Sequence, residues 1–161
     1  MIYKVYFFVN RIKRKTIFGQ WGNRGLDKIL GYIEAYFNQW IVQQYKNVPK
    51  KTLGITRVKR EQKIIVSLTS YPKRINTLWL TIETLLRQSM KPDEIILWLA
   101  EDQFEGINSL PDELLEQQKR GLTIRFCDDL RSHKKYYYVM QEHPDDIVIL
   151  FDDDMFYPYD T

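Results

Sequence analysis

From residue 63 onward, short apolar runs alternate with longer amphipathic stretches. The apolar runs predict four strands, at Ile64 to Leu68, Glu94 to Leu99, Leu122 to Phe126 and Ile147 to Phe151. All except Leu122 to Phe126 are nearly continuous in Ile, Leu and Val, which is typical of strands covered on both faces. Strands that alternate with helices indicate repeated βαβ units and a parallel sheet.

Three helices are predicted between these strands. Apolar residues of the first recur at spacings of three, four and seven, which places on one helix face Ile75, Leu78, Ile82, Leu85 and Leu86. The second begins near Ser109, has Pro111 in its first turn and ends before Gly121. The third runs from about Ser132 to Glu142. The predicted fold class is therefore α/β, with a Rossmann-like, mostly parallel sheet and flanking helices.

Residues 1–62 have a different character from the rest. They hold 13 Lys and Arg against 3 Asp and Glu, whereas residues 63–161 hold 11 against 18. The stretch from Leu26 to Tyr45 keeps a helical period of apolar residues, and Lys46 to Gln62 is typical of a basic linker. We therefore predict a basic, aromatic helical extension over residues 1–62 that precedes an α/β domain over residues 63–161.

Composition narrows the class of protein. The chain has 161 residues, of which 44% are hydrophobic and 28% charged, and this balance excludes disordered and collagen-like proteins. Its single cysteine, Cys127, cannot form an intramolecular disulfide, so a reducing compartment is expected. No stretch approaches the roughly 20 apolar residues that cross a bilayer. We expect a cytoplasmic protein.

The basic extension has two main interpretations. Lys, Arg and aromatic side chains on a helix can bind anionic headgroups, which would place the protein on the inner face of the membrane. A helix that packs its apolar stripe on the sheet is an equal alternative. Nucleic-acid binding would also suit a basic segment, but no nucleic-acid fold signature accompanies it.

Polar residues follow each predicted strand. The carboxyl ends of parallel strands share one sheet edge, and ligands of open α/β sheets bind along it. In chain order the loops at this edge carry residues 69–74 (TSYPKR), Glu101 and Asp102, Asp128 and Asp129, and Asp152 to Asp154. Hydroxyls, cations and carboxylates are therefore expected to meet there.

The three consecutive aspartates carry the strongest chemical signal. Carboxylates crowded at the end of a buried strand repel one another and lose solvation, which raises their pKa values unless a cation compensates. A hard divalent ion with oxygen ligands supplies that compensation and leaves positions for substrate phosphates. A solvated acidic turn is the alternative, and the position of Asp152 to Asp154 after an apolar strand favours the cation site.

Several segments, taken in order, resemble the start of a bacterial glycosyltransferase domain of the GT-A type. They are SLTSYPKRI, PDEIILWLA, LPDEL, GLTIRFCDD, HKKYYY and IVILFDDD. The chain is similar here to family 2 enzymes of capsule or lipopolysaccharide synthesis, and the resemblance covers about residues 63–159. A DXD motif alone is weak evidence. Its place after a fourth strand, together with the SYP loop after the first, makes it more specific.

The resemblance implies a nucleotide site at the sheet edge. Contacts to the nucleotide would come from Thr69, Ser70, Tyr71 and Arg74. Asp128 or Asp129 would bond to the base, and Arg131, Lys134 and Lys135 would support the base or the diphosphate. The alternative for these three cations is an exposed basic turn at the start of a helix.

The resemblance also implies a metal and a reaction. Asp152 or Asp153 would bind the ribose, while Asp152 and Asp154 would hold Mn²⁺ or Mg²⁺ across the diphosphate. The enzyme would transfer a sugar from a nucleoside diphosphate sugar to the hydroxyl of a saccharide or lipid-linked acceptor. The metal would act as a Lewis acid, and a general base would take the acceptor's proton. No residue of this chain is a convincing base.

In such enzymes the acceptor half follows the metal motif, and only seven residues follow Asp154. We therefore expect a truncated, donor-binding half with little activity of its own. A non-catalytic nucleotide-sugar sensor or a nucleic-acid-binding module is the alternative. A phosphotransfer receiver would need an acid after the first strand, and residues 67–71 contain none.

Overall fold

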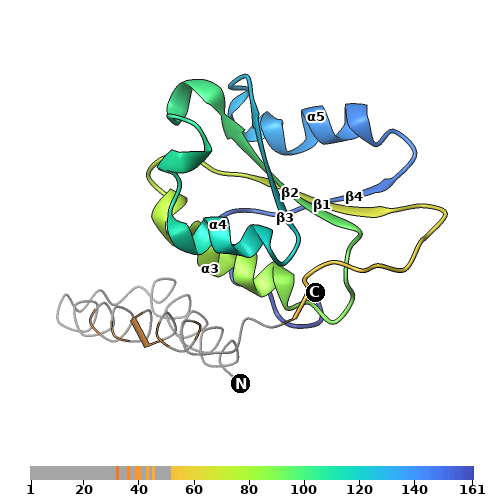
Figure 1. The fold of residues 1–161 in the computed structure, drawn as a ribbon, viewed down its shortest axis with the longest axis horizontal. Helices are drawn as coiled ribbons and strands as arrows, with labels where there is room; N and C mark the ends of the chain where they lie inside the picture. The colour runs from red at the N-terminus through yellow and green to blue at the C-terminus, as the bar shows by residue number, and fades with distance from the viewer. Residues whose placement is uncertain (1–31, 33–35, 37–38, 41–42, 44, 46–51) are drawn as a thin grey trace, which may run out of the picture. The chain divides into compact units, whose positions relative to one another are not determined.

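The computed structural model describes residues 32, 36, 39–40, 43, 45 and 52–161 (Figure 1). The chain divides into two compact units, Met1–Lys50 and Lys51–Thr161. In the first unit the six described residues are helical, and they fall where a helix was predicted; the rest of the predicted extension lies outside the described residues. No helix found among the described residues has both the length and the apolar character that a membrane crossing requires.

The second unit is built on a four-stranded sheet. Its strands are β1 (Ile64–Thr69), β2 (Glu94–Ala100), β3 (Leu122–Cys127) and β4 (Ile147–Leu150). The strand order is β3-β2-β1-β4, and all three neighbouring pairs are parallel. The predicted α/β class with a parallel sheet is confirmed.

Helices cover both faces of this sheet. Helices α3 (Ile75–Leu86) and α4 (Asp112–Gln118) lie on one face, and α5 (Lys134–Glu142) lies on the other (Figure 1). Helix α4 begins later than predicted, because Pro111 is extended at ψ 142°. Three short 3-10 turns complete the unit: η1 (Glu101–Gln103), η2 (Ile107–Ser109) and η3 (Arg131–His133).

The main core lies between the sheet and α3 with α4. The apolar stripe of α3 meets the inner strands there, and Leu78, Ile82 and Leu68 are fully buried. Burial of one such side chain contributes about 2 kcal/mol. A smaller core on the α5 face includes Val139 and Trp98, whose ring stacks on a tyrosine of α5 at a centroid distance of 5.3 Å.

Strand β4 departs from the prediction that it would be covered on both faces. It lies at the edge of the sheet and pairs with β1 alone among the described strands. Ile147 is 46% exposed, Ile149 40% and Leu150 38%. The prediction of a buried fourth strand is therefore wrong, because an apolar run reports the character of a strand and not the number of its neighbours.

Residues 52–62, which the sequence placed in a linker, contact the α/β unit. The Gly54 amide donates to the Arg120 carbonyl at 2.8 Å, and the Thr56 amide donates to the Pro92 carbonyl at 2.8 Å. A Cβ at Gly54 would lie 2.1 Å from Cδ2 of Leu86, so this backbone packs directly on α3. The segment thus belongs to the same compact unit as the sheet.

A buried ion cluster joins α3 to the end of α4. The Glu83 side chain is completely buried and accepts from Arg87 Nε at 2.5 Å and from Arg120 Nη1 at 2.6 Å. Arg120 is itself only 8% exposed, and its Nε donates to the Thr52 carbonyl at 3.0 Å. Because Glu83 has no access to water, this carboxylate depends on the two arginines to stabilise its charge.

The crossovers determine where a ligand can enter. The connections β1-α3-β2 and β2-α4-β3 run on one face of the sheet, whereas β3-α5-β4 returns on the other. The direction of winding therefore reverses between β1 and β4. Such a reversal opens a crevice outside the carboxyl ends of the two strands.

Candidate functional site

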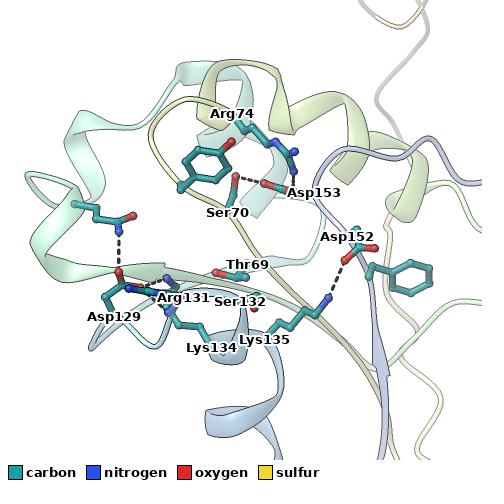
Figure 2. A pocket seen from close by; sticks show the side chains of 13 residues that line it. Thr69, Ser70, Arg74, Asp129, Arg131, Ser132, Lys134, Lys135, Asp152 and Asp153 are labelled. Carbon is teal, nitrogen blue, oxygen red and sulfur yellow. Dashed lines mark hydrogen bonds and ion pairs between the residues drawn. The ribbon is translucent and has the colours of Figure 1, made fainter.

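A pocket of about 500 Å³ lies at that crevice (Figure 2). The loop after β1, the η1 turn, the η3 turn with the start of α5, and the end of β4 all contribute to it. Among the predicted nucleotide-binding residues, those that line the pocket are Thr69, Ser70, Tyr71, Arg74, Asp129, Arg131, Lys134, Lys135, Asp152 and Asp153. Segments distant in sequence are thus brought together at one sheet edge.

Asp153 is the inward-facing member of the acidic triplet. Its side chain is 9% exposed, and it accepts from Ser70 Oγ at 2.7 Å and from Arg74 Nη1 at 2.5 Å (Figure 2). The Thr81 hydroxyl of α3 also donates to the Asp153 carbonyl at 3.0 Å. The hydrogen bond to Asp153 raises the pKa of Arg74, against the opposing effect of burial. Asp153 therefore joins the loop after β1 to the end of β4.

Asp152 points toward α5, on the face of the sheet opposite to α3. Its carboxylate is 64% exposed and accepts from Lys135 Nζ at 2.7 Å (Figure 2). The Tyr157 hydroxyl accepts from the Asp152 amide at 2.9 Å and donates to the Asp152 carbonyl at 3.3 Å. Burial raises the pKa of Tyr157. The Tyr157 ring packs edge-on against the Phe151 ring, with 4.5 Å between the ring centroids. The backbone of Asp152 is thereby fixed while its carboxylate stays open to water.

The triplet obtains counter-charge from side chains. Arg74 pairs with Asp153 and also with Asp154, at 3.0 Å through Nη2, and Lys135 pairs with Asp152. Across the described part of the chain, no group of three or more His, Cys, Asp or Glu could hold a metal ion. One arginine and one lysine therefore supply counter-charge to the three aspartates.

The donor set nevertheless fits a hard cation in chemical type. Asp152 and Asp154 are the exposed carboxylates, at 64% and 49%. Mg²⁺ is commonly held by one or two carboxylates together with substrate phosphates, so a cage of three acids is not required. Lys135 pairs with Oδ1 of Asp152, and Arg74 pairs with Oδ2 of Asp154. An ion could therefore bind through the second oxygen of each carboxylate or displace these cations.

Asp129 organises the opposite wall of the pocket. It accepts from Lys134 Nζ, from the Arg131 amide at 2.8 Å and from Gln103 Nε2 at 2.9 Å. The hydrogen bond from Lys134 is the main cause of a lowered pKa for Asp129. Arg131 has φ 53°, a left-handed conformation that is costly for a residue with a Cβ. The hydrogen bond from its amide to Asp129 stabilises this conformation.

The pocket lining carries more positive than negative groups. Arg74, Arg131, Lys134 and Lys135 face three carboxylates there. Lys134 is 3% exposed and forms an ion pair with Asp129, whereas Arg131 is exposed to solvent. A pocket with an excess of cations, one of them open to water, can take a bound anion.

Two predicted residues lie outside the lining, and three unpredicted ones lie within it. Asp128 is exposed, and its carbonyl accepts from the Tyr138 hydroxyl at 3.2 Å. Asp154 borders the pocket through its ion pair with Arg74. Sequence reasoning missed Gln103, Ser132 and Phe151. Ser132 and Phe151 are next in sequence to predicted site residues, so their position in the chain could have indicated them. For Gln103 the sequence offered only its place in the loop after β2.

Comparison of the chain with protein-family models, with curated proteins and with solved structures found no match. What the site can do follows from its own residues.

Proposed function

We propose that this chain binds a nucleoside diphosphate sugar in the pocket and acts as the donor-binding part of a GT-A-like glycosyltransferase. One observation carries the proposal: a pocket at the switch point of a parallel sheet combines four cations with the aspartates that follow β4. Its volume of about 500 Å³ lies in the range of small-molecule sites. The segments that resemble family 2 enzymes supply the same loops.

The diphosphate is proposed to lie between the cations of the two walls. Arg131 is exposed, and Lys135 and Arg74 hold exchangeable carboxylates at the mouth of the pocket. Arginine and lysine are the usual partners of phosphate oxygens. The nucleoside would then extend toward Tyr71, a residue that is 41% exposed. Because Asp129 already accepts from three donors, its proposed part is to orient Lys134 and the Arg131 backbone rather than to bind the base directly.

The divalent ion is proposed to bind at Asp152 and Asp154. When bound, Mn²⁺ or Mg²⁺ would act as a Lewis acid on the leaving diphosphate. The chain's own part is to present the two carboxylates, through Tyr157 at the backbone of Asp152 and Arg74 beside Asp154. Displacement of Lys135 from Asp152 would turn this ammonium toward the phosphates. Transfer to the acceptor, a saccharide or a lipid-linked sugar, also requires a general base, and we assign this role to no residue of the pocket.

A panel of nucleotides tests the proposal directly. Thermal unfolding would be followed with UDP, GDP, CMP and their sugars, each with and without Mn²⁺. We expect one nucleotide to raise the melting temperature, and to raise it most when Mn²⁺ is present, because a ligand that binds only the native state stabilises it. The matched control is Lys135→Met, which removes one phosphate partner from the rim. A flat response to every nucleotide would end the proposal.

A non-catalytic nucleotide-sugar-binding module is the second candidate. The observation that favours it is that Arg74 and Lys135 already pair with all three aspartates, which would let the pocket accept an anion without a metal. Binding that is equal with EDTA and with Mn²⁺, without sugar transfer to any acceptor, would favour this candidate.

We also propose that residues 1–62 bring the protein to an anionic membrane surface, on the ground of their 13 basic residues. Flotation with phosphatidylserine vesicles at low and high salt tests this, and absence of binding at both would exclude it. A nucleic-acid partner would instead give a steep salt dependence with DNA or RNA.

A further inference from the structure

The two edges of the sheet are built differently. On β3, Arg125 lies in the middle of the strand and pairs with Glu94 at 3.5 Å and with Glu142. A charged residue at this place protects an edge from pairing with another strand. On β4 the four residues are Ile-Val-Ile-Leu, with no charge and no proline, and Ile149 is 40% exposed.

The backbone of β4 also has open hydrogen-bonding groups. Its inner side bonds to β1, since Ile147 donates to the Lys63 carbonyl at 2.9 Å and Phe151 donates to the Ser67 carbonyl at 3.0 Å. Successive residues of a strand point in opposite directions within the sheet plane. The amide and carbonyl groups of Val148 and Leu150 therefore face the outer edge, where no described strand pairs with them.

We propose that the outer edge of β4 is a docking site for an extended segment of another polypeptide, which adds to the sheet as a fifth strand. Main-chain hydrogen bonds to Val148 and Leu150 would hold it. Apolar side chains of the incoming strand would cover the exposed Ile147, Ile149 and Leu150. This proposal rests on the open edge of β4 and needs no nucleotide in the pocket, although two acids that flank the edge, Asp152 and Asp154, also belong to the proposed nucleotide site.

Charge defines the kind of strand that fits. Asp145 is exposed before β4, and after it the three aspartates of the triplet face only two cations, Arg74 and Lys135, so an excess of negative charge remains at both ends. The incoming strand should therefore carry Lys or Arg at both ends and apolar residues between them. A second copy of β4 fits poorly, because antiparallel self-pairing would bring residues 145–146 of one copy against residues 152–153 of the other.

The position of this edge places the partner beside the pocket. Strand β4 runs directly into Asp152 and Asp153, both of which line the pocket. A strand paired with β4 that continued past Leu150 would lie near Asp152, whose carboxylate is 64% exposed. The partner would thus supply polypeptide next to the pocket.

Two synthetic peptides test the proposal. One is Lys-Lys-Thr-Val-Ile-Val-Thr-Lys-Lys, and the other has Glu in place of every Lys. Each would be titrated into the ¹⁵N-labelled full chain while amide signals and amide hydrogen exchange are followed. We expect the basic-ended peptide to slow exchange at Val148 and Leu150, and to bind about tenfold tighter than the acidic-ended one at low salt.

Matched variants identify the edge that is used. Ile149→Lys places a charge on the exposed face of β4 and should abolish the effect, whereas Thr123→Lys on the β3 edge should leave it unchanged; melting temperatures would show that both variants fold. Equal affinity for the two peptides, or no effect up to about 1 mM, would overturn the proposal. So would self-association of the chain that Ile149→Lys prevents, because the occupant would then be a second copy.

Discussion

Two groups of acids in this domain pair with basic side chains, and they differ in their access to water. Glu83 is fully buried between Arg87 and Arg120, while Asp152 and Asp154 stand 64% and 49% exposed beside Lys135 and Arg74. A buried pair cannot exchange partners without leaving a charge in a low dielectric, whereas an exposed pair can open at little cost. The ion pairs of Glu83 therefore hold α3 and the end of α4 together, whereas those of Asp152 and Asp154 can open to admit a ligand.

The largest effect is expected from Glu83→Gln. The substitution keeps the shape of the side chain and removes the charge that Arg120 requires, so the free energy of unfolding should fall by about 3 kcal/mol. Urea denaturation monitored by circular dichroism measures it. The matched change at the exposed cluster, Asp152→Asn, should lower stability by no more than about 1 kcal/mol. Equal losses in the two variants would remove the distinction between the clusters.

Asp152→Asn should instead act on ligand binding. Under the proposed function it removes one of two metal ligands, and metal-dependent nucleotide affinity should fall about tenfold, or 1.4 kcal/mol. Isothermal titration with and without Mn²⁺ measures this. Glu83→Gln serves as the control at a temperature where it is folded, and its affinity should match that of the unchanged chain. An unaltered Mn²⁺ response in Asp152→Asn would place the metal elsewhere.

A smaller effect is expected from Tyr157→Phe. The change keeps the ring contact with Phe151 and removes the hydroxyl that bridges the amide and carbonyl of Asp152. The loss should be about 1 kcal/mol of stability, the usual contribution of one hydrogen bond. Thermal unfolding detects it, and faster amide exchange at Asp152 would locate it. No change at Asp152 would show that other contacts fix this backbone.

The smallest effect on stability is expected from Asp146→Asn, just before the start of β4. The amide of Lys63 and the ring of His143 donate to Asp146 and lower its pKa below the ordinary aspartate value of about 3.9. The stability that this carboxylate contributes is fully present above that value and is lost as the pH falls through the lower pKa of the folded state. Melting temperatures of Asp146→Asn and the unchanged chain should therefore converge as the pH falls below about 3.9. A gap of constant size would contradict this.

Much of the fold could be predicted because it is encoded by local periodicity. The apolar stripe from Ile75 to Leu86 marks α3, and the runs at residues 64–68 and 94–99 mark β1 and β2 to within one residue. The loops after the strands were predicted to share one edge because a parallel sheet requires it. Four residues of the loop after β1 do line one pocket with Asp129 and Asp152, namely Thr69, Ser70, Tyr71 and Arg74.

What the sequence by itself determined was the identity and order of the elements, since hydrophobic spacing is a property of neighbouring residues. Only the tertiary structure decided that β4 lies at an edge, that Glu83 is buried against Arg120, and that Arg74 pairs with Asp153. Each of these depends on residues far apart in the chain. A carboxylate in a sequence does not indicate which cation will reach it, because that choice is made by the packing of whole helices and strands.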